Sequence, residues 1–95
     1  MKQALTLAKA YTFHTDPGHG WLAVATSEIE ALNIPVTPFS YVSPDGLTYY
    51  LEEDLDAGTF LALRKKLAIP FEIVETHTNA SHWIRNLTSG GRNKK

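Results

Sequence analysis

Two short phrases of the sequence hold all four histidines and both tryptophans, "HTDPGHGW" at 14–21 and "HTNASHW" at 77–83. Imidazole nitrogens together with a carboxylate oxygen are ligands that suit Zn²⁺ and similar borderline ions. Such a site would support a metal-dependent hydrolase or nuclease, with Asp16 or Glu53 as the general base. The candidate ligands for this reading are His14, Asp16, His19 and His77.

A structural interpretation of the same two phrases stays open beside the metal site. The two histidines of each phrase are five positions apart, which directs them away from each other on a helix, and the zinc signature HExxH is absent. In the first phrase, Asp16 would accept hydrogen bonds in a turn. In the second, Thr78 or Asn79 would cap a short last helix. Trp83 and Leu87, four positions apart, would then pack that helix down.

A run of carboxylates is the second candidate for chemistry. Side-chain oxygens at a helix N-terminus accept its free N–H groups and are favoured by the helix dipole, which accounts for Asp54 or Asp56. The remaining acids suit a cation or an Arg/Lys-rich protein surface. The run lies at a predicted strand-to-helix junction and consists of Glu52, Glu53, Asp54 and Asp56.

The hairpin phrase and the acidic run together predict a surface that binds a protein. Gly18 and Gly20 allow the loop to approach a partner closely, and Trp21 offers an aromatic anchor. No phosphate-binding loop, nucleophile elbow or dinucleotide fingerprint occurs in the sequence, so we expect binding without a cofactor rather than catalysis. The expected partner-binding residues are His19, Trp21, Glu52, Glu53 and Asp54.

Length and charge bound the remaining possibilities. A chain of 95 residues with 43% hydrophobic residues suits one domain with one core, and the absence of cysteine favours a cytoplasmic protein. The start of the chain is too polar for a signal peptide or a membrane span. Residues 1–84 carry ten acidic and five basic groups, whereas residues 85–95 carry four basic groups and no acidic one. We therefore expect a domain at 1–88 and a flexible basic tail at 89–95.

Nucleic-acid binding is a further alternative, as an accessory protein that contacts phosphate through its basic groups. The acidic body opposes this alternative, because it would repel phosphate. The groups in question are Arg64, Lys65, Lys66, Arg85 and the tail.

The secondary-structure elements expected to position these residues repeat one order, strand, strand, helix, in the two halves of the chain. Strand-like "AYTFHT" and "WLAVAT" flank a loop at 16–20, and a capping box of Ser27 and Glu30 begins a short helix. "FSYVS" and "LTYYLEE" flank a "PDG" turn, a helix follows at 56–68, and "FEIVETH" alternates as a half-buried strand should. The predicted fold is α+β with the order ββαββαβ, a mainly antiparallel sheet and both helices on one face.

Side-chain spacing on the second helix predicts which of its faces is buried. Phe60, Leu63 and Leu67 form one apolar stripe, and Arg64 with its two lysine neighbours faces outward. If the first hairpin and the last strand are adjacent in the sheet, we expect His14 and His77 to be neighbours.

Three separated motifs, "FHTDPGHGWLAV", "YYLEEDLDAGTF" and "ETHTNASHWIR", give the chain a resemblance to a family of small uncharacterised domains in bacteria, phages and plasmids. Small proteins from such mobile elements often bind and block host machinery. The resemblance therefore implies an inhibitor of a host defence protein or nucleoprotein complex, of which CRISPR effectors are one kind. It is carried by His14, Gly18 to Leu22, Tyr50 to Asp54, Asp56, Ala57, Phe60, His77 to Asn79, Ile84 and Arg85.

Overall fold

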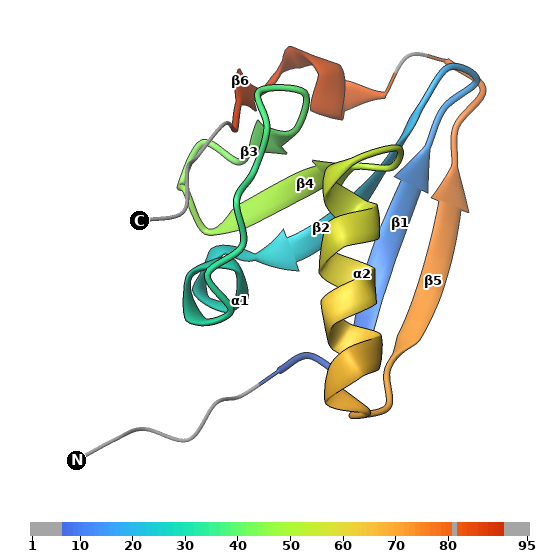
Figure 1. Ribbon diagram of the computed structural model, residues 1–95. Helices are drawn as coiled ribbons and strands as arrows, with labels where there is room; N and C mark the ends of the chain where they lie inside the picture. The colour runs from blue at the N-terminus through green and yellow to red at the C-terminus, as the bar shows by residue number, and fades with distance from the viewer. Residues whose placement is uncertain (1–6, 81, 91–95) are drawn as a thin grey trace.

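The computed structural model describes residues 7–80 and 82–90, and in these the predicted order of elements is confirmed. A 3₁₀ turn and a two-residue strand follow the predicted ββαββαβ order (Figure 1). In chain order the elements are β1 (Ala10–Thr15), β2 (Gly20–Ala25), α1 (Thr26–Ala31), β3 (Tyr41–Val42), β4 (Thr48–Glu52), α2 (Asp56–Leu67), β5 (Glu72–His77), η1 (Trp83–Asn86) and β6 (Thr88–Ser89).

The strands form one sheet in the order β5-β1-β2-β4-β3-β6. Neighbouring strands are antiparallel except β1 and β5, which run parallel. The parallel pair is a consequence of α2, since a parallel neighbour needs a long crossover and the helix supplies it. The predicted α+β class and mainly antiparallel sheet are therefore confirmed.

Strand register decides which side chains share a face of the sheet. Phe13 lies opposite Leu22, and Leu22 lies opposite Leu51, so these three form one row across three strands. The next row along the strands consists of His14, Trp21 and Glu52. Because successive side chains of a strand point to opposite faces, the apolar row and the row with the functional candidates lie on opposite sides of the sheet.

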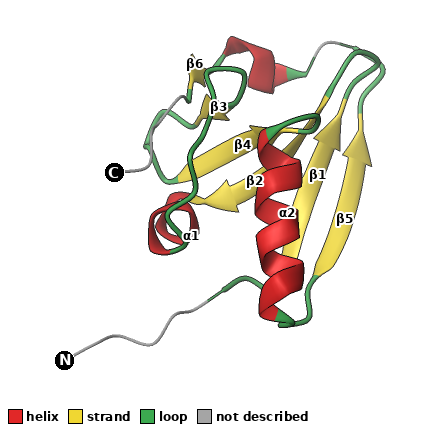
Figure 2. Ribbon diagram, viewed as in Figure 1, coloured by secondary structure: helices red, strands yellow, loops and turns green. Residues whose placement is uncertain are grey.

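Both helices cover the face that carries the apolar row. Ile29 of α1 and Phe60 of α2 are fully buried in one cluster with Leu22 and Leu51. Figure 2 shows α2 in front of the sheet, across its middle, and α1 beside the end of β2. The prediction of two helices on one face is confirmed, and the opposite face is left to other segments.

The predicted buried stripe of α2 is partly wrong. Phe60 is buried, but Leu67 is exposed and Arg64 is fully buried. The Arg64 guanidinium donates to the Tyr11 hydroxyl, which donates to Glu28 at 2.6 Å. The guanidinium also lies 4.6 Å from the ring centre of Phe71. A buried arginine is tolerable here because hydrogen bonds and a ring replace its water.

The end of α2 was predicted closely from the sequence, but the N-terminal caps of both helices were not. Helix α2 ends at Leu67, one residue before the predicted end, and Ala68 adopts the left-handed conformation with φ 56°. The capping box is wrong, because α1 begins at Thr26 and no side chain caps it. Neither Asp54 nor Asp56 caps α2, whose N-cap is Leu55 without a side-chain bond.

The sheet reaches slightly into the predicted tail. Ser89 of β6 pairs with Tyr41, and the Gly90 N–H donates to the Ser40 carbonyl at 2.7 Å. The rest of the predicted tail, at 91–95, lies outside the described residues. Among the described residues, no helix has the length and apolar character needed to cross a membrane.

Candidate functional site

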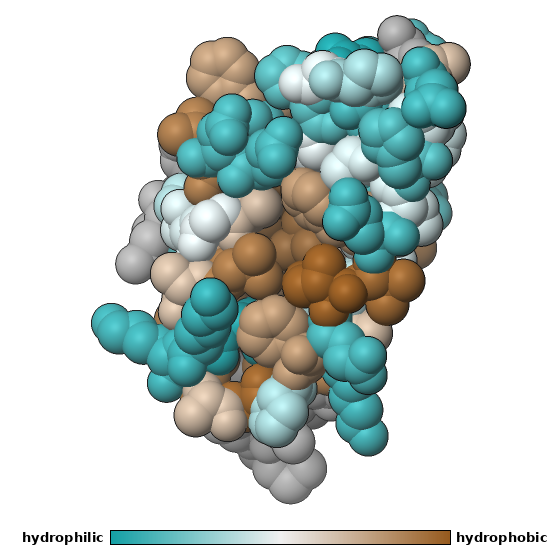
Figure 3. Space-filling view, turned by 90° about the vertical axis from the view of Figure 1, so that its right-hand side faces the viewer, coloured by the Kyte–Doolittle hydropathy of each residue, from teal (hydrophilic) through white to brown (hydrophobic). Residues whose placement is uncertain are grey.

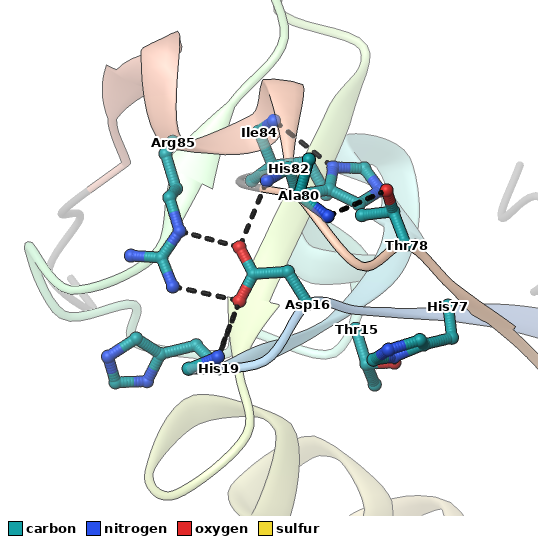
Figure 4. Close-up of polar contacts among 10 residues, drawn as sticks. Thr15, Asp16, His19, His77, Thr78, Ala80, His82, Ile84 and Arg85 are labelled. Carbon is teal, nitrogen blue, oxygen red and sulfur yellow. Dashed lines mark hydrogen bonds and ion pairs between the residues drawn. The ribbon is translucent and has the colours of Figure 1, made fainter.

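The Asp16 carboxylate joins the first hairpin to the C-terminal segment. Its Oδ1 accepts from the N–H groups of Gly18 at 2.9 Å and His19 at 3.0 Å, and from Arg85 Nη2 at 2.8 Å. Its Oδ2 accepts from the His82 N–H at 3.0 Å and from Arg85 Nε at 2.6 Å. Figure 4 shows the carboxylate between the two segments. With 1% of its side chain exposed, Asp16 is a buried and fully bonded acid.

The surroundings of Asp16 keep it ionised. The hydrogen bond from Arg85 holds the pKa of the Asp16 carboxyl far below its usual range, and the N–H groups of His82, His19 and Gly18 add to this against the opposing effect of burial. The same contact raises the pKa of Arg85. Both carboxylate oxygens accept hydrogen bonds from protein donors, which disfavours the predicted role of Asp16 as a metal ligand or base. Its predicted role in the turn is correct.

The two histidine phrases meet in space, but not through the expected histidines. In the parallel pair of β1 and β5, His14 lies opposite Thr76, and Thr15 lies opposite His77. The Thr78 N–H continues the ladder and donates to the Thr15 carbonyl at 3.0 Å. Because the register is offset by one residue, His14 and His77 are on adjacent strands and on opposite faces.

His14 instead contacts the C-terminal segment on the face away from the helices. Its ring centre is 5.1 Å from that of His82 and 5.9 Å from those of Tyr50 and Trp83. Burial, with the nearby His82 as a smaller cause, lowers the pKa of His14. The neutral imidazole therefore behaves as one ring of an aromatic cluster.

His77 belongs to a separate set of polar contacts. Its Nδ1 lies 2.7 Å from the Thr15 hydroxyl, and its Nε2 lies 3.2 Å from the Asn79 side-chain oxygen. In Figure 4 the His77 ring lies beside Thr15 and away from Asp16 and His19. Within residues 7–80 and 82–90, no group of three or more His, Asp or Glu side chains could hold a metal ion. The predicted four-ligand set is thus not assembled there.

The C-terminal segment uses a different cap from the predicted one. His82 is the N-cap of η1, and its Nδ1 accepts from the Ile84 N–H at 3.2 Å. Ile84 is fully buried, while Trp83 is half exposed. The prediction that Thr78 or Asn79 caps a helix held down by Trp83 is wrong, because the chain only bends at Asn79 and Ala80, and the 3₁₀ turn begins later, at Trp83.

A groove lies where the hairpin, the β4–α2 junction and the C-terminal segment meet. Its volume is about 490 Å³. Trp21 is buried beneath the Arg85 guanidinium, which lies 5.2 Å from the centre of the ring. Phe39 and Leu55 have exposed fractions of 66% and 49%. The lining residues are His19, Trp21, Pro38, Phe39, Tyr41, Glu52, Asp54, Leu55 and Arg85.

Four of the five predicted partner-binding residues therefore line one groove, and Glu53 does not.

The four carboxylates of the acidic run have different roles. Glu52 Oε1 accepts from the N–H groups of Asp54 and Leu55, both at 3.0 Å. Asp56 accepts from the Thr37 N–H at 2.9 Å and also binds the Ser40 hydroxyl. Two of the four carboxylates thus shape the junction, while Glu53 and Asp54 are exposed.

Several groove residues were not foreseen from the sequence. Phe39 and Leu55 look like ordinary strand or helix residues by their patterns, and only the structure leaves them exposed at one site. Arg85 is a partial exception, since it belongs to the motif "ETHTNASHWIR". A lone arginine after a tryptophan gives no indication that its partner is Asp16, 69 positions earlier.

Neither a scan of protein-family models nor searches of curated proteins and solved structures found a match to this chain. The function must therefore be argued from the site itself.

Proposed function

We propose that this protein is a binding module whose groove receives an arginine or lysine side chain from a partner protein. The observation that carries the proposal is the joint presence of exposed apolar groups, aromatic rings and acids around one open groove. Binding surfaces commonly combine such an aromatic and apolar centre with charged groups that set orientation.

The charges of the groove favour a cationic side chain. Arg85 is the basic residue of the lining, and its charge is matched by Asp16 through two hydrogen bonds. Glu52 and Asp54 add two carboxylates to the lining. A guanidinium or ammonium group would meet these acids, and its aliphatic stem would lie along Phe39. The ring of Tyr41 would add cation–π attraction, while the Trp21 ring already carries the Arg85 guanidinium.

The nucleic-acid alternative receives less support from the same charges. Arg64 is buried and Arg85 is bonded to Asp16, so two groups of the predicted basic surface are used inside the protein. The basic tail beyond Gly90 lies outside the described residues. An acidic groove favours proteins that themselves bind nucleic acid, because such proteins present arginine and lysine.

This preference agrees with the class of partner that the family resemblance implies. Under the proposal, the protein acts in the cytoplasm and occupies a basic surface of a host defence complex, for example a CRISPR effector. The acidic groove then competes with nucleic acid for that surface.

A titration with N-acetyl-arginine amide tests the groove directly, with N-acetyl-citrulline amide as the neutral control. In ¹⁵N-labelled protein, we expect the arginine probe to shift the Leu55 amide and the Trp21 indole signals. Asp54→Lys should weaken this binding about tenfold or more, since hydrogen bonds to charged groups contribute roughly 1.5–3 kcal/mol.

Glu53→Lys is the matched control for that variant, because it makes the same charge change at the neighbouring exposed acid outside the groove. It should weaken binding far less. Equal shifts with the citrulline probe, or equal losses in the two variants, would contradict the groove as the site.

The cellular part of the proposal has its own test. Wild-type protein and Glu53→Lys should protect a targeted plasmid from CRISPR interference in bacteria, and Asp54→Lys should not. Failure of all three to protect, with the arginine titration positive, would reject the defence target and leave the binding module.

A further inference from the structure

In the part of the chain that the structure describes, strand β5 forms one edge of the sheet and directs half of its backbone groups outward. The Glu72 N–H donates to the Lys9 carbonyl at 2.9 Å, and the Thr78 N–H donates to the Thr15 carbonyl at 3.0 Å. In a parallel ladder, alternate residues of a strand face the neighbour. Even-numbered residues of β5 therefore bond to β1, and Ile73, along with the other odd-numbered residues, directs its N–H and C=O away from the sheet.

The same edge exposes apolar side chains. Every residue of β5 is exposed, so the prediction of a half-buried strand is wrong. The exposed fractions are 44% for Ile73 and 52% for Val74, and Leu67 and Ile69 just before the strand are exposed as well. Figure 3 faces this side of the molecule and shows hydrophobic surface gathered in its middle, between hydrophilic regions. An open strand edge with apolar side chains favours pairing with another strand.

We infer that the free edge of β5 pairs antiparallel with β5 of a second copy, across a two-fold axis at Val74. Hydrogen bonding allows the axis only at whole residues of the strand, because outward-facing residues must lie opposite each other. An axis at Glu75 would place that carboxylate opposite its own copy, which is unfavourable. An axis at Thr76 would leave only Glu75–His77 of each copy within the paired strands.

The axis at Val74 avoids both problems. Val74 lies opposite its own copy, and Ile73 of the two copies are diagonal neighbours, so the apolar residues of the edge meet at the centre. Glu72 lies opposite Thr76 and Glu75 lies opposite Ile73, so no carboxylate lies directly opposite another, and the two Glu75 side chains are diagonal neighbours in the same way as the two Ile73 side chains. The strand is therefore complementary to itself, and a second copy fits this edge without any change in sequence.

Two substitutions to lysine test the association. Sedimentation and light scattering from about 1 µM to about 1 mM, a range that brackets weak association, should show wild-type protein passing from monomer to dimer. Val74→Lys should remain a folded monomer over that range, because lysine on both copies repels at the axis. Leu47→Lys is the matched control, since Leu47 is an exposed apolar residue far from β5 in the sheet, and it should dimerise as wild type does.

Two cysteine variants test the register, and the chain has no cysteine of its own. Val74→Cys should form a dimer linked by a disulfide under mild oxidation, because directly opposite residues of a non-hydrogen-bonded pair are about 4.5 Å apart. Thr76→Cys should not, since the two copies of Thr76 would be displaced by four residues, about 13 Å along the strands.

A wild-type protein that stays monomeric throughout would overturn the inference and leave the edge to another partner. Dimerisation of Val74→Lys, or cross-linking of Thr76→Cys in preference to Val74→Cys, would overturn it too. None of these three outcomes bears on the proposed groove, because Val74 is not among its lining residues.

Discussion

The two faces of the sheet are closed in different ways. On the helix face, α1 and α2 seal a continuous apolar cluster around Phe60 and Leu22. On the opposite face, a short C-terminal segment lies over aromatic rings that include Trp21 and His14. The segment is attached at one end by a single carboxylate, Asp16, through its bonds to the backbone and side chain of residues in that segment.

Because of this difference, the helix face contributes most to the stability of the fold, and the opposite face offers the more accessible surface. The helix face gains from the burial of many apolar groups, which is additive and does not depend on any single bond. The opposite face is covered by a segment that combines the Asp16–Arg85 ion pair with the short ladder of β6 and β3, and the groove opens beside it, between Arg85 and Leu55. A binding surface is expected on the face whose cover is short and polar.

The largest effect should come from the helix face. Phe60→Ala removes a fully buried ring and should lower the free energy of unfolding by about 3–5 kcal/mol, enough to unfold much of a domain this small. Urea denaturation followed by circular dichroism measures the change. Leu67→Ala, at an exposed position of the same helix, should have a much smaller effect. Similar losses for the two variants would contradict the assigned buried stripe.

The next effect should be confined to the opposite face. Asp16→Asn keeps the shape of the side chain but removes the charge that binds Arg85. Hydrogen exchange at the amides of Ile84 and Leu87 should accelerate roughly tenfold or more through local opening, while β4 amides such as Leu51 stay protected. Asp45→Asn is the control, because it alters another bonded acid whose side chain accepts only from residues of its own turn, Ser43 and Leu47. Uniform acceleration across the protein would show that the two faces are not separable.

Asp16 on one face and Tyr11 on the other should lose their contributions to the stability of the fold at opposite ends of the pH scale. The pKa of Asp16 is lowered in the folded state, so its contribution is present above the unfolded value of about 3.9 and is lost as the pH falls below it. The pKa of Tyr11 is raised by burial and by the Glu28 carboxylate, so its contribution is present below about 10 and is lost as the pH rises.

Thermal melts across the pH range measure both losses. Tyr11→Phe should remove most of the alkaline loss and leave the acid loss, and Asp16→Asn should do the reverse. A variant that removed both losses would contradict the assignment of the acid loss to Asp16 and the alkaline loss to Tyr11.

The smallest effect should come from His14. Its pKa is lowered in the folded state, so the neutral ring contributes stability above the unfolded value of about 6.5, and this contribution is lost as the pH falls through the folded value. His14→Gln should therefore flatten a shallow decline in melting temperature on the acid side of 6.5. His19→Gln, at an exposed turn position, is the control and should leave the decline unchanged.

Much of the fold could be predicted from local sequence. Alternating residues gave β1 at the residues observed, turn signals separated β3 from β4, and apolar spacing with the following "AIP" placed α2 to within one residue. The groove was partly predictable for a similar reason. His19, Trp21, Glu52 and Asp54 adjoin turns at the ends of β2 and β4, and those neighbouring strands bring them together.

The roles of Arg64 and Asp16 were beyond local sequence. Arg64 is held in the core by its hydrogen bond to Tyr11, 53 positions away. From sequence alone, an arginine on a helix is expected to face solvent. Asp16 binds Arg85 across 69 positions. No spacing rule connects residues so far apart, because their contact depends on how the elements pack.

By itself, the sequence determined the number, type and order of the main elements, since hydrophobic periodicity and turn chemistry act over a few residues. Only the tertiary structure decided that β5 lies beside β1 in a register that places His14 opposite Thr76. A shift of one residue moves every side chain of a strand to the other face. That register separates His14 from His77, and in the described part of the two phrases the contacts of Asp16 build a structural junction while the predicted metal-ligand set is not assembled.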